Sequence, residues 1–428
     1  MRNADIVVAS DEAQERLGGI ADWFLVHNRD IYMRVDDSVV RTHEGKSRVL
    51  RRSRGYVPHP VDLGIDLQQI LACGAELKNT FCLTKSHYAI LSQHIGDMEN
   101  YETLLFFQET LANLKKLFRV EPQAVAYDLH PRYLSSRFAL ELPLGKKIGV
   151  QHHHAHIAGC MAENHLKDEV IGVAFDGTGY GTDGQIWGGE FLVADFAGFE
   201  RRAHLKYVPL PGGDAAIRQP WRSALAHLRA TFGAGTLPDS LSFLRAVPQR
   251  EVSIVESMLS RNINTIRTSS CGRLFDAVAS LIGLRHEVNF EGQAAIELES
   301  AALPGIEQVY PFSIEDSDPA HVDMRPTVEA IVKDVTAGKS AAHISACFHN
   351  TLAGAIVEVC RRISKTDGLK RVCLSGGTFQ NLYLLDRTAK GLRRAGLEVF
   401  LHSLVPANDG GISLGQAVIA NQRLRNGD

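Results

Sequence analysis

VIGVAFDGTGYGTDGQIWGGEFLVADF, residues 170–196, is the stretch of sequence that decides the fold. An apolar run leads to Asp176, a glycine-rich turn follows, and a second apolar run begins after Gln185. Short apolar runs bounded by glycine turns are typical of strands, so we interpret this stretch as strand, turn and strand. Residues 70–96, ILACGAELKNTFCLTKSHYAILSQHIG, have the same plan. Two halves that begin alike predict a duplicated α/β architecture with a ligand site in the cleft between them.

The rest of the chain supplies helices and strands to these halves. Apolar residues recur with a spacing of 3.6 at 101–118, which predicts a helix. In chain order we further expect a buried strand at 124–129, a mostly helical region at about 205–330, a long helix at 340–363, a strand and glycine turn at 371–381, a strand at 398–403 and a final helix after 411. The first half is therefore predicted at 66–166 and the second at 167–425. Residues 1–60 read as the end of another unit, followed by a linker at Pro58 and Pro60.

The bulk composition excludes several classes of protein. The 428 residues carry a formal net charge of -3, which gives no bias toward nucleic acid or membrane surfaces. No apolar run approaches the roughly 18 residues that span a bilayer, and the N-terminus lacks the layout of a signal peptide. The seven dispersed cysteines argue against both a disulfide framework and a zinc finger. We therefore expect a cytoplasmic protein with reduced, buried thiols.

QHHHAHIAGCMAEN, which begins at Gln151, carries the sharpest chemical signal. His152 and His156 are four residues apart, so on a helix they lie on one face and can share a metal ion. Imidazole nitrogens suit zinc or iron, and carboxylates commonly complete such a shell. His153 and His154 point elsewhere around the helix, where packing or hydrogen bonding is as good an interpretation as contact with a substrate.

Two aspartates are candidates to complete the metal shell. Asp176 ends an apolar strand and precedes glycines, which let the backbone of the site approach a ligand closely. Asp409, in PANDGGISLG, lies just ahead of the last helix. Taken alone, Asp409 would be interpreted as a helix cap or turn residue.

Three glycine-rich turns are candidates to cradle a nucleotide through backbone N–H groups. The residues concerned are Gly177 and Gly179 in DGTGYGTDG, Gly376, Gly377 and Asn381 in LSGGTFQN, and Lys78 in CGAELKNTF. None of the turns is a P-loop or a dinucleotide fingerprint. The alternative for each turn is a tight bend in a sheet. For Lys78 the partner is either a phosphate or acyl oxygen or a surface carboxylate.

Four further segments carry charged candidates. SSCGRLFDAVASLIG places Arg273 and Asp276 at the start of a helix, facing whatever binds there. A later helix carries three glutamates, of which Glu297 is our candidate for hydrogen bonding to ribose, against the alternative of a solvated face. Asp214, Arg218 and Arg222 lie in LPGGDAAIRQPWRSAL, where Pro220 interrupts the helix. Residues 41–54 have a local charge balance of +5, which fits either anion binding or a solvated loop, and the positive residues are Arg41, Lys46, Arg48, Arg51, Arg52 and Arg54.

These motifs together resemble a known family. HHHAH, FDGTGYGTDGQIWGGEF, LPGGDAAIRQPWR, SSCGRLFDAVA, FEGQAA, LSGGTFQN and PANDGGISLGQ are similar, in that order, to the C-terminal domain of the HypF carbamoyltransferases. That domain is similar to the TsaD proteins and the antibiotic O-carbamoyltransferases, which have the fold of actin, Hsp70 and sugar kinases. The resemblance covers about Gly74 to Ile419 and implies two actin-like (ribonuclease H-like) lobes with a helical insertion.

The resemblance also implies roles for individual residues. The metal, zinc or iron, would be held by His152, His156, Asp176 and Asp409. The turn at Gly376 and Gly377, with Asn381, would line the site of the nucleotide, ATP or the AMP part of carbamoyl-adenylate. Lys78, Arg218 and Arg222 would face the phosphate or the carbamoyl group, and carry the catalytic role.

Residues 1–60 resemble the closing part of the YrdC-like domain of the same family. A full member would carry upstream an acylphosphatase-like domain, a zinc-finger region and most of the YrdC-like α/β fold, which is thought to form carbamoyl-adenylate. The implied function of this chain is carbamoyl transfer to the C-terminal cysteine of a HypE-like partner during hydrogenase maturation. The alternatives are a small-molecule O-carbamoyltransferase of the same fold and an inactive, truncated partner-binding module.

Overall fold

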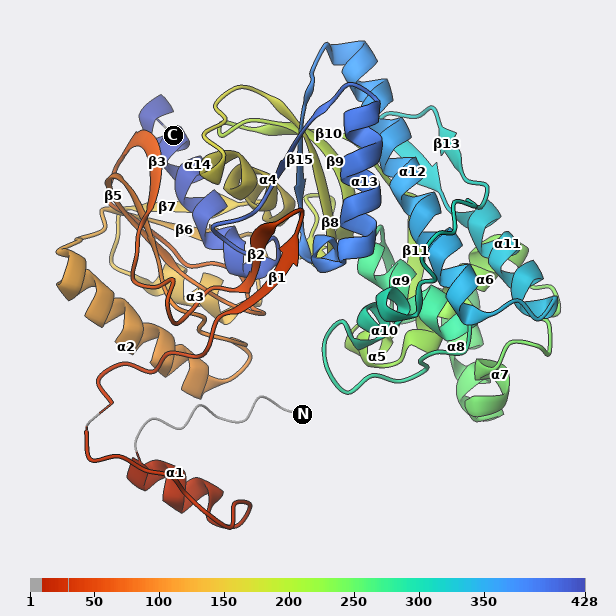
Figure 1. Cartoon of the computed structure of the whole chain (residues 1–428), viewed down its shortest axis with the longest axis horizontal. Coiled ribbons are helices and arrows are strands. Elements are labelled where there is room, and N and C mark those ends of the chain that lie inside the picture. The colour runs from red at the N-terminus through yellow and green to blue at the C-terminus, as the bar shows by residue number, and fades with distance from the viewer. Residues whose placement is uncertain (1–9, 30, 428) are drawn as a thin grey trace.

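The structure is a computed structural model that describes residues 10–29 and 31–427. Two sheets stand side by side, with helices between them and on both outer faces (Figure 1). The predicted two-lobed α/β fold is therefore confirmed. The first nine residues of the predicted segment 1–60 lie outside the described residues. Within the described ranges, no helix is both long enough and apolar enough to span a lipid bilayer.

The first lobe is built on a five-stranded sheet. Its strands, in spatial order, are β3 (Val61–Leu67), β5 (Cys82–Leu91), β4 (Ile70–Ala72), β6 (Ala124–Asp128) and β7 (Lys146–Val150). Strand β5 runs antiparallel to both neighbours, and β4, β6 and β7 are parallel. The outer face is covered by α2 (Tyr101–Phe118) and α3 (Leu134–Glu141), whose apolar side chains pack on those of the sheet.

The second lobe is built on a nine-stranded sheet. Seven strands follow one another in the order β13 (Ser313–Glu315), β14 (Ala320–Asp323), β10 (Phe199–Leu205), β9 (Ile186–Ala194), β8 (Val170–Tyr180), β15 (Arg371–Ser375) and β16 (Glu398–Leu401). Strands β11 (Val208–Pro211) and β12 (Thr265–Thr268) branch from β9. The predicted insertion at 205–330 is mostly helical, but it also supplies four of these short strands, which the sequence analysis did not predict.

Helices of the second lobe cover the outer face of the large sheet (Figure 1). They are α5 (Asp214–Arg218), α6 (Pro220–Phe232), α7 (Phe243–Ala246), α8 (Gln249–Arg261), α9 (Cys271–Leu281), α10 (Gln293–Ala301), α11 (Arg325–Thr336), α12 (Ala341–Asp367) and α13 (Leu382–Arg394). The largest apolar core lies between this layer and the sheet, and it includes the fully buried Trp221 and Phe275.

Two helices fill the space between the sheets. Helix α4 (His152–Glu163) and the last long helix, α14 (Ile412–Asn426), pack against each other. Helix α14 also packs on strands of the first lobe, whereas α4 packs mainly on β8, β9 and β15 of the second lobe. Their close contact depends on Gly415, because a Cβ atom there would lie 1.8 Å from the carbonyl oxygen of Ala155. Helix α14 thus lies beside the first sheet although the chain reaches it from the second lobe.

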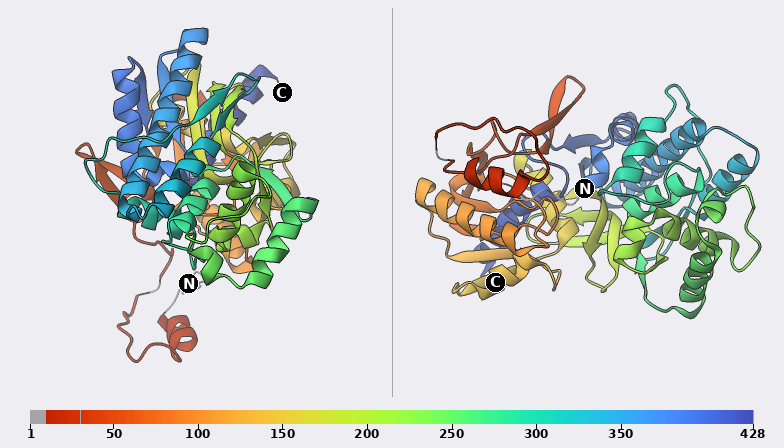
Figure 2. Two further views of the ribbon diagram at one scale, coloured as in Figure 1. Left: turned by 90° about the vertical axis from the view of Figure 1, so that its right-hand side faces the viewer. Right: turned by 90° about the horizontal axis from the view of Figure 1, so that it is seen from below.

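The N-terminal segment runs along one side of the lobes. Helix α1 (Ser10–Leu17) stands apart from both sheets in Figure 1 and in the left view of Figure 2. A hairpin of β1 (Val39–His43) and β2 (Lys46–Arg51) then lies over the junction of the lobes (Figure 1). This hairpin contacts residues of the second lobe before the chain enters β3.

Candidate metal and nucleotide site

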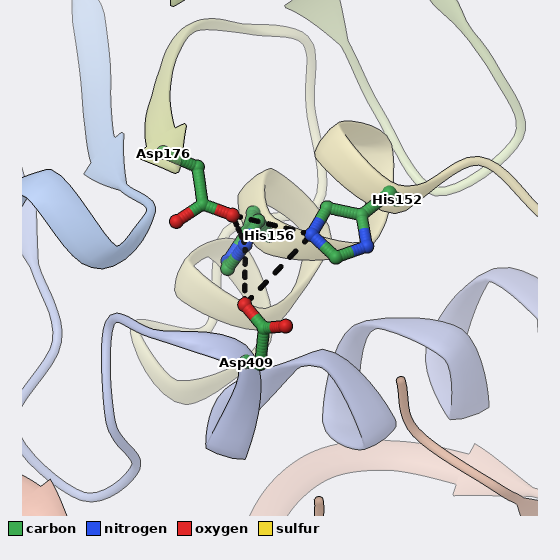
Figure 3. Close-up of side chains that lie close together, drawn as sticks. All are labelled: His152, His156, Asp176 and Asp409. Atoms are coloured by element: carbon green, nitrogen blue, oxygen red, sulfur yellow. Dashed lines mark hydrogen bonds and ion pairs between the residues drawn. The ribbon is translucent and has the colours of Figure 1, made fainter. Parts of the chain in front are cut away.

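The four predicted metal ligands converge between the lobes (Figure 3). His152 and His156 lie on α4, Asp176 on β8, and Asp409 at the start of the short 3-10 helix η2 (Asp409–Gly411) that leads into α14. One donor atom from each residue lies within 4.8 Å of the corresponding atoms of the other three. The structure thus brings together residues that are separated by up to 257 positions in the chain, counting from 152 to 409.

Local structure explains why the two imidazoles share one face. Gln151 caps α4, because its side-chain oxygen accepts a hydrogen bond from the backbone N–H of His154 at 2.9 Å. The helix starts at His152, so His156 lies one turn further along the same face. Gly179 lets β8 approach this helix, since a Cβ atom there would lie 2.7 Å from Cδ2 of His152.

The distances between donor atoms fit a single tetrahedral ion. Oδ2 of Asp176 lies 3.3 Å from Nε2 of His152 and 3.4 Å from Nε2 of His156. Oδ1 of Asp409 lies 3.8 and 3.7 Å from the same two nitrogens. A tetrahedral ion with bonds of roughly 2.0–2.1 Å separates its ligand atoms by about 3.3 Å. Nε2 of His156 is buried and has no hydrogen-bond partner, as expected of a nitrogen that faces a cation.

A buried carboxylate behind the site orients His152. Nδ1 of His152 lies 2.8 Å from Oδ2 of Asp128, and both side chains are fully buried. The carboxylate holds the proton on Nδ1, so the lone pair of Nε2 is directed at the ligand cluster. On the other side, Oδ1 of Asp176 accepts a hydrogen bond from the N–H of Gly377 at 2.9 Å, which leaves Oδ2 for the cluster.

A second buried chain of polar groups lies behind His156. Nδ1 of His156 lies 3.5 Å from Oγ of Ser375, which is hydrogen-bonded to Nε2 of His402 at 2.8 Å. Nδ1 of His402 in turn lies 2.5 Å from Oε1 of Glu163. The other oxygen of Glu163 accepts the N–H groups of Ser403 and Leu404. Both metal-facing imidazoles are therefore supported by a buried carboxylate, one directly and the other through two residues.

The electrostatics of the cluster favour a bound cation. Burial and the neighbouring Asp176 raise the pKa of Asp409 to about 8. Burial alone would lower the pKa of His152, but Asp128 and Asp176 hold it well above its usual value. Burial acts to raise the pKa of Asp176, but the two imidazoles beside its carboxylate outweigh this effect and hold the pKa well below its usual range. The metal-free cluster therefore retains protons that a bound cation would displace.

A cavity adjoins the cluster and contains most of the predicted nucleotide-binding residues. Its volume is about 380 Å³, and Asp176 and Asp409 form part of its wall. The predicted residues that line it are Gly177, Gly377, Asn381, Asp276 and Lys78. Lys78, from the first lobe, forms an ion pair with Glu291 of the second lobe across this cavity, so its partner here is a carboxylate.

Two of these lining residues are held by further contacts. Oδ1 of Asn381 caps α13 by accepting the N–H of Leu384 at 2.9 Å, and its Nδ2 lies 2.8 Å from Nε2 of His349. Asp276 pairs with Arg273 at 2.9 Å, and burial raises the pKa of Asp276 to about 6. Both side chains are thus fixed before a ligand enters.

Other predicted residues lie outside the cavity wall. Gly376 is buried beneath it and has a φ of +101°, in the region that favours glycine. Glu297 pairs with Arg285 at 2.6 Å and faces away, whereas Glu299, two residues along α10, lines the cavity. Arg222 hydrogen-bonds Gln219, and neither Arg222 nor Arg218 is among the lining residues. These three charged side chains remain predictions without a contact at the cavity.

The sequence analysis missed several residues of the site. Asp128 ends the strand AVAYD as Asp176 ends VIGVAFD, and this shared pattern is the signal that could have found it. Leu50 and Gln380 line the cavity, and no local pattern indicates their position, whereas Arg41, which also lines it, belongs to the basic stretch that was considered for anion binding. Asn408 also lines the cavity and takes the capping role that had been considered for Asp409, because its side chain accepts the N–H of Gly410.

The fold and the site together define a two-lobed α/β protein, with polar groups from both lobes meeting beside an interlobe cavity. Comparison with known proteins narrows this class. Residues 66–163 match the family description "HypF Kae1-like domain", and residues 172–416 match "Carbamoyltransferase, Kae1-like Domain, second subdomain". The chain therefore belongs to the HypF carbamoyltransferase family.

Individual relatives agree with this assignment. The chain is 41% identical to carbamoyltransferase HypF of Rhizobium leguminosarum bv. viciae, with 98% of this chain and 54% of that protein covered. It is 38% identical to a carbamoyltransferase HypF homolog of Cupriavidus necator, with 83% and 92% covered. A crystal structure of full-length HypF in the phosphate- and nucleotide-bound form superposes with a TM-score of 0.95 at 48% identity, over 99% of this chain and 55% of that one.

A second solved relative, the HypF of T. kodakarensis, superposes with a TM-score of 0.88 at 35% identity. The superposition covers 98% of this chain and 56% of the T. kodakarensis chain. The chain thus spans about half the length of most relatives that it matches.

Proposed function

We propose that this chain transfers a carbamoyl group from carbamoyl-adenylate to the C-terminal cysteine thiol of a HypE-like protein. In this role it would act in the cytoplasm, in the synthesis of the cyanide ligands of nickel–iron hydrogenase. The names of its relatives support the carbamoyl group, and the relative solved with phosphate and nucleotide supports an adenylate. No nucleic acid or membrane partner is part of the proposal.

One observation carries the proposal: two residues belong both to the candidate metal site and to the wall of the cavity. Asp176 and Asp409 belong to both, so an ion and a nucleotide bound here would be in contact. A bound dication, zinc or iron, would polarise the carbamoyl carbonyl and stabilise the departing phosphate, which is worth several kcal/mol in a transition state. His152, His156, Asp176 and Asp409 are the residues that would hold it.

The remaining residues of the site bind and orient. Gly177 lets the backbone of the large sheet lie directly on the cavity, and the N–H of Gly377 holds Asp176 in place. Lys78 lies at the cavity wall, where an incoming phosphate would compete with Glu291 for its ammonium group. Asp128 keeps His152 in one tautomer.

In the proposed reaction, the cysteine thiol of the acceptor protein is the only nucleophile. A C–S bond forms between the thiol sulfur and the carbamoyl carbon, and the C–O bond to the adenylate phosphate breaks. AMP leaves with the electron pair of that bond, and the thiol proton is released to water. All seven cysteines of this chain are buried, and burial raises the pKa of Cys73 and Cys271, which makes them poor nucleophiles.

The domain assignments are part of the proposal. Residues 1–60 correspond to the tail of a YrdC-like domain, and exposed Trp23 and Leu25 are side chains that the rest of such a domain would cover. The first actin-like lobe comprises 66–166 and the second 167–425, except that α14 packs with the first. Carbamoyl-adenylate would be formed by the upstream half that the longer relatives contain.

Purified variants test the proposal. The upstream half of a full-length relative, with carbamoyl phosphate and ATP, would supply carbamoyl-adenylate in trans. The acceptor is a peptide that ends in cysteine, and mass spectrometry detects the added carbamoyl group. We expect His152→Ala and His156→Ala to lose both bound metal and transfer while keeping the fold. His87→Ala, a partly exposed imidazole on β5, is the control and should retain both.

The outcomes separate the alternatives. Wild-type metal content in the two histidine variants would remove the proposed metal site. Transfer to small hydroxyl compounds but not to the peptide would identify an O-carbamoyltransferase. Binding of a HypE-like protein without any transfer would identify a partner-binding module.

A further inference from the structure

Several arginines of the basic stretch at 41–54 contact the protein itself, although Lys46 and Arg54 are exposed. Arg48 donates to the carbonyl oxygen of His402 at 2.5 Å, and Arg52 donates to the carbonyl oxygens of Tyr56 and His59. Arg54 donates to Val35 O and pairs with Asp37 at the surface. Neither of the two roles considered for this stretch describes these contacts, so the hairpin β1–β2 needs another explanation.

Arg41 is the basic residue of this stretch that lines the cavity. Its Nη2 donates to Oε1 of Glu299 at 2.9 Å, and its Nη1 donates to Oε2 of Glu299 and to the carbonyl oxygen of Gln380, both at 3.1 Å. Arg41, Glu299 and Gln380 all line the cavity. The two parallel bonds to one carboxylate fix the orientation of both side chains more firmly than a single contact would.

Glu299 joins three elements through this contact. Its side chain is 13% exposed, and Oε1 also accepts the backbone N–H of Leu382 at 2.9 Å. Leu382 begins α13 directly after the glycine turn at Gly377. Arg41 therefore fixes a carboxylate that in turn holds the helix start beside the nucleotide cavity.

The hairpin also contacts the loop of a metal-ligand candidate. The carbonyl oxygen of Leu50 accepts a hydrogen bond from Nδ2 of Asn408 at 3.0 Å, and the same amide donates to Oε1 of Gln380 at 2.9 Å. Asn408 precedes Asp409 in the chain. The hairpin thus contacts both walls of the site, the start of α13 and the loop that carries Asp409.

The charges around the cavity show why an arginine is needed at this position. Apart from the metal-ligand candidates Asp176 and Asp409, the described lining has three carboxylates, Asp276, Glu291 and Glu299, and three cations, Lys78, Arg41 and Arg273, so the loss of one cation leaves an excess of carboxylates. A phosphate that enters an excess of carboxylates is repelled. Removal of Arg41 would leave the Glu299 carboxylate without its cation and free to turn into the cavity.

We propose that Arg41 is a positioning residue of the nucleotide pocket, and that the hairpin β1–β2 completes this pocket from outside the two ranges that match the family descriptions. The inference rests on the proposed nucleotide site. Arg41 acts by holding Glu299 and the start of α13 and by balancing the carboxylate charge at the cavity wall. The tail of the upstream region is then part of the transferase site.

The second lobe offers a matched control on the same hairpin. Arg393 of α13 forms a two-bond contact with Glu44 at the hairpin tip, at 2.7 and 3.2 Å. The side chains of Arg393 and Arg41 are similarly exposed, 43% and 39%, although Glu44 is more exposed than Glu299, 34% against 13%. Arg393 does not line the cavity. Arg393→Ala therefore weakens hairpin docking without removing a cation from the pocket.

The experiment compares AMP binding by calorimetry for the full chain loaded with metal. We expect Arg41→Ala to raise the Kd for AMP about tenfold. The Kd of Arg41→Lys should lie between those of Arg41→Ala and the wild type. The Kd of Arg393→Ala should stay within about twofold of the wild-type value. Metal content should be unchanged in all three. The midpoint of thermal unfolding should fall by a similar small amount in Arg41→Ala and Arg393→Ala, because each loses one partly exposed pair.

Two results would overturn the inference. An equal loss of AMP affinity in Arg41→Ala and Arg393→Ala would show that the hairpin acts only as a structural support. Wild-type affinity in Arg41→Ala would show that the arginine has no part in the pocket. If the wild-type chain itself binds no AMP, the proposed nucleotide site fails and the inference fails with it.

Discussion

Replacement of Asp128 by asparagine gives a demanding test of the candidate metal site, because it changes no ligand. Oδ2 of Asp128 lies 2.8 Å from Nδ1 of His152, and Oδ1 accepts the N–H of His130, also at 2.8 Å. Asparagine has one oxygen and one NH2 group for these two contacts. If its oxygen keeps the His130 bond, its NH2 faces Nδ1 and forces the imidazole proton onto Nε2, where it blocks the metal. If the amide turns the other way, the bond to His130 is lost.

The size of the effect follows from the burial of this contact. Changes of this kind behind a metal ligand typically cost 10- to 100-fold in metal affinity. Asp128 and His152 are both fully buried, so water cannot replace the lost acceptor. We therefore expect a loss near the upper limit, about 100-fold or roughly 2.7 kcal/mol.

Competition for zinc with a chromophoric chelator measures the affinity directly. Ser136→Ala is the matched control, because buried Ser136 donates to the backbone oxygen of Asp128 at 2.7 Å and does not contact the carboxylate. The control should bind zinc like the wild type. Wild-type zinc affinity in Asp128→Asn would refute the reasoning, since either orientation of the amide weakens the support of His152, one by changing its tautomer and the other by losing the His130 bond and the negative charge behind the imidazole.

Two further predictions concern packing and pH. Gly415→Ala should destabilise the fold by about 3 kcal/mol or more, because the new Cβ would lie 1.8 Å from the backbone oxygen of Ala155. Gly354→Ala is the control: its new Cβ would meet no atom within 4 Å, so it should stabilise α12 by up to about 1 kcal/mol. Urea unfolding of both variants checks this pair, and equal stabilities would contradict the packing of α4 on α14. Chelator-treated protein should lose unfolding free energy as pH rises toward about 8. The folded-state pKa of Asp409 is raised to that value, and the pKa of His152 is also raised. Both groups therefore stabilise the fold only while they are protonated. Added zinc should remove this loss, and a chelated protein that becomes more stable over the same range would contradict the assignment.

The fold could be predicted from sequence where local periodicity and packing agree. The helix expected at 101–118 occupies Tyr101–Phe118, because apolar side chains at helical spacing, among them Phe107, Leu111 and Leu114, pack on the first sheet. The strands within 205–330 could not be predicted in the same way. Strand β12, for example, has four residues and pairs with β11 and β9, which are both distant in the chain, and nothing near it in sequence indicates those partners.

The candidate site shows the same division between local and distant signals. His152 and His156 could be found because helical spacing alone places them on one face. Glu297 was chosen over Glu299 as the residue expected to bind ribose. Two residues along a helix correspond to a rotation of more than half a circle, so these two side chains face opposite ways. Both faces of α10 carry polar residues, and only the contact with Arg41 and Leu382 identifies the one toward the cavity.

The position of Asp176 has a thermodynamic consequence for how the site would work. One carboxylate oxygen faces the imidazoles, and the other holds the N–H of Gly377 at the cavity wall. An ion that draws this carboxylate toward α4 must therefore also move or tighten the glycine turn on which a nucleotide would rest. Coupling between two bound ligands is reciprocal, so the ion must raise nucleotide affinity by the same factor as the nucleotide raises ion affinity. Because the ligands come from α4, β8 and the start of α14, that shared factor also measures how firmly the two lobes are held together.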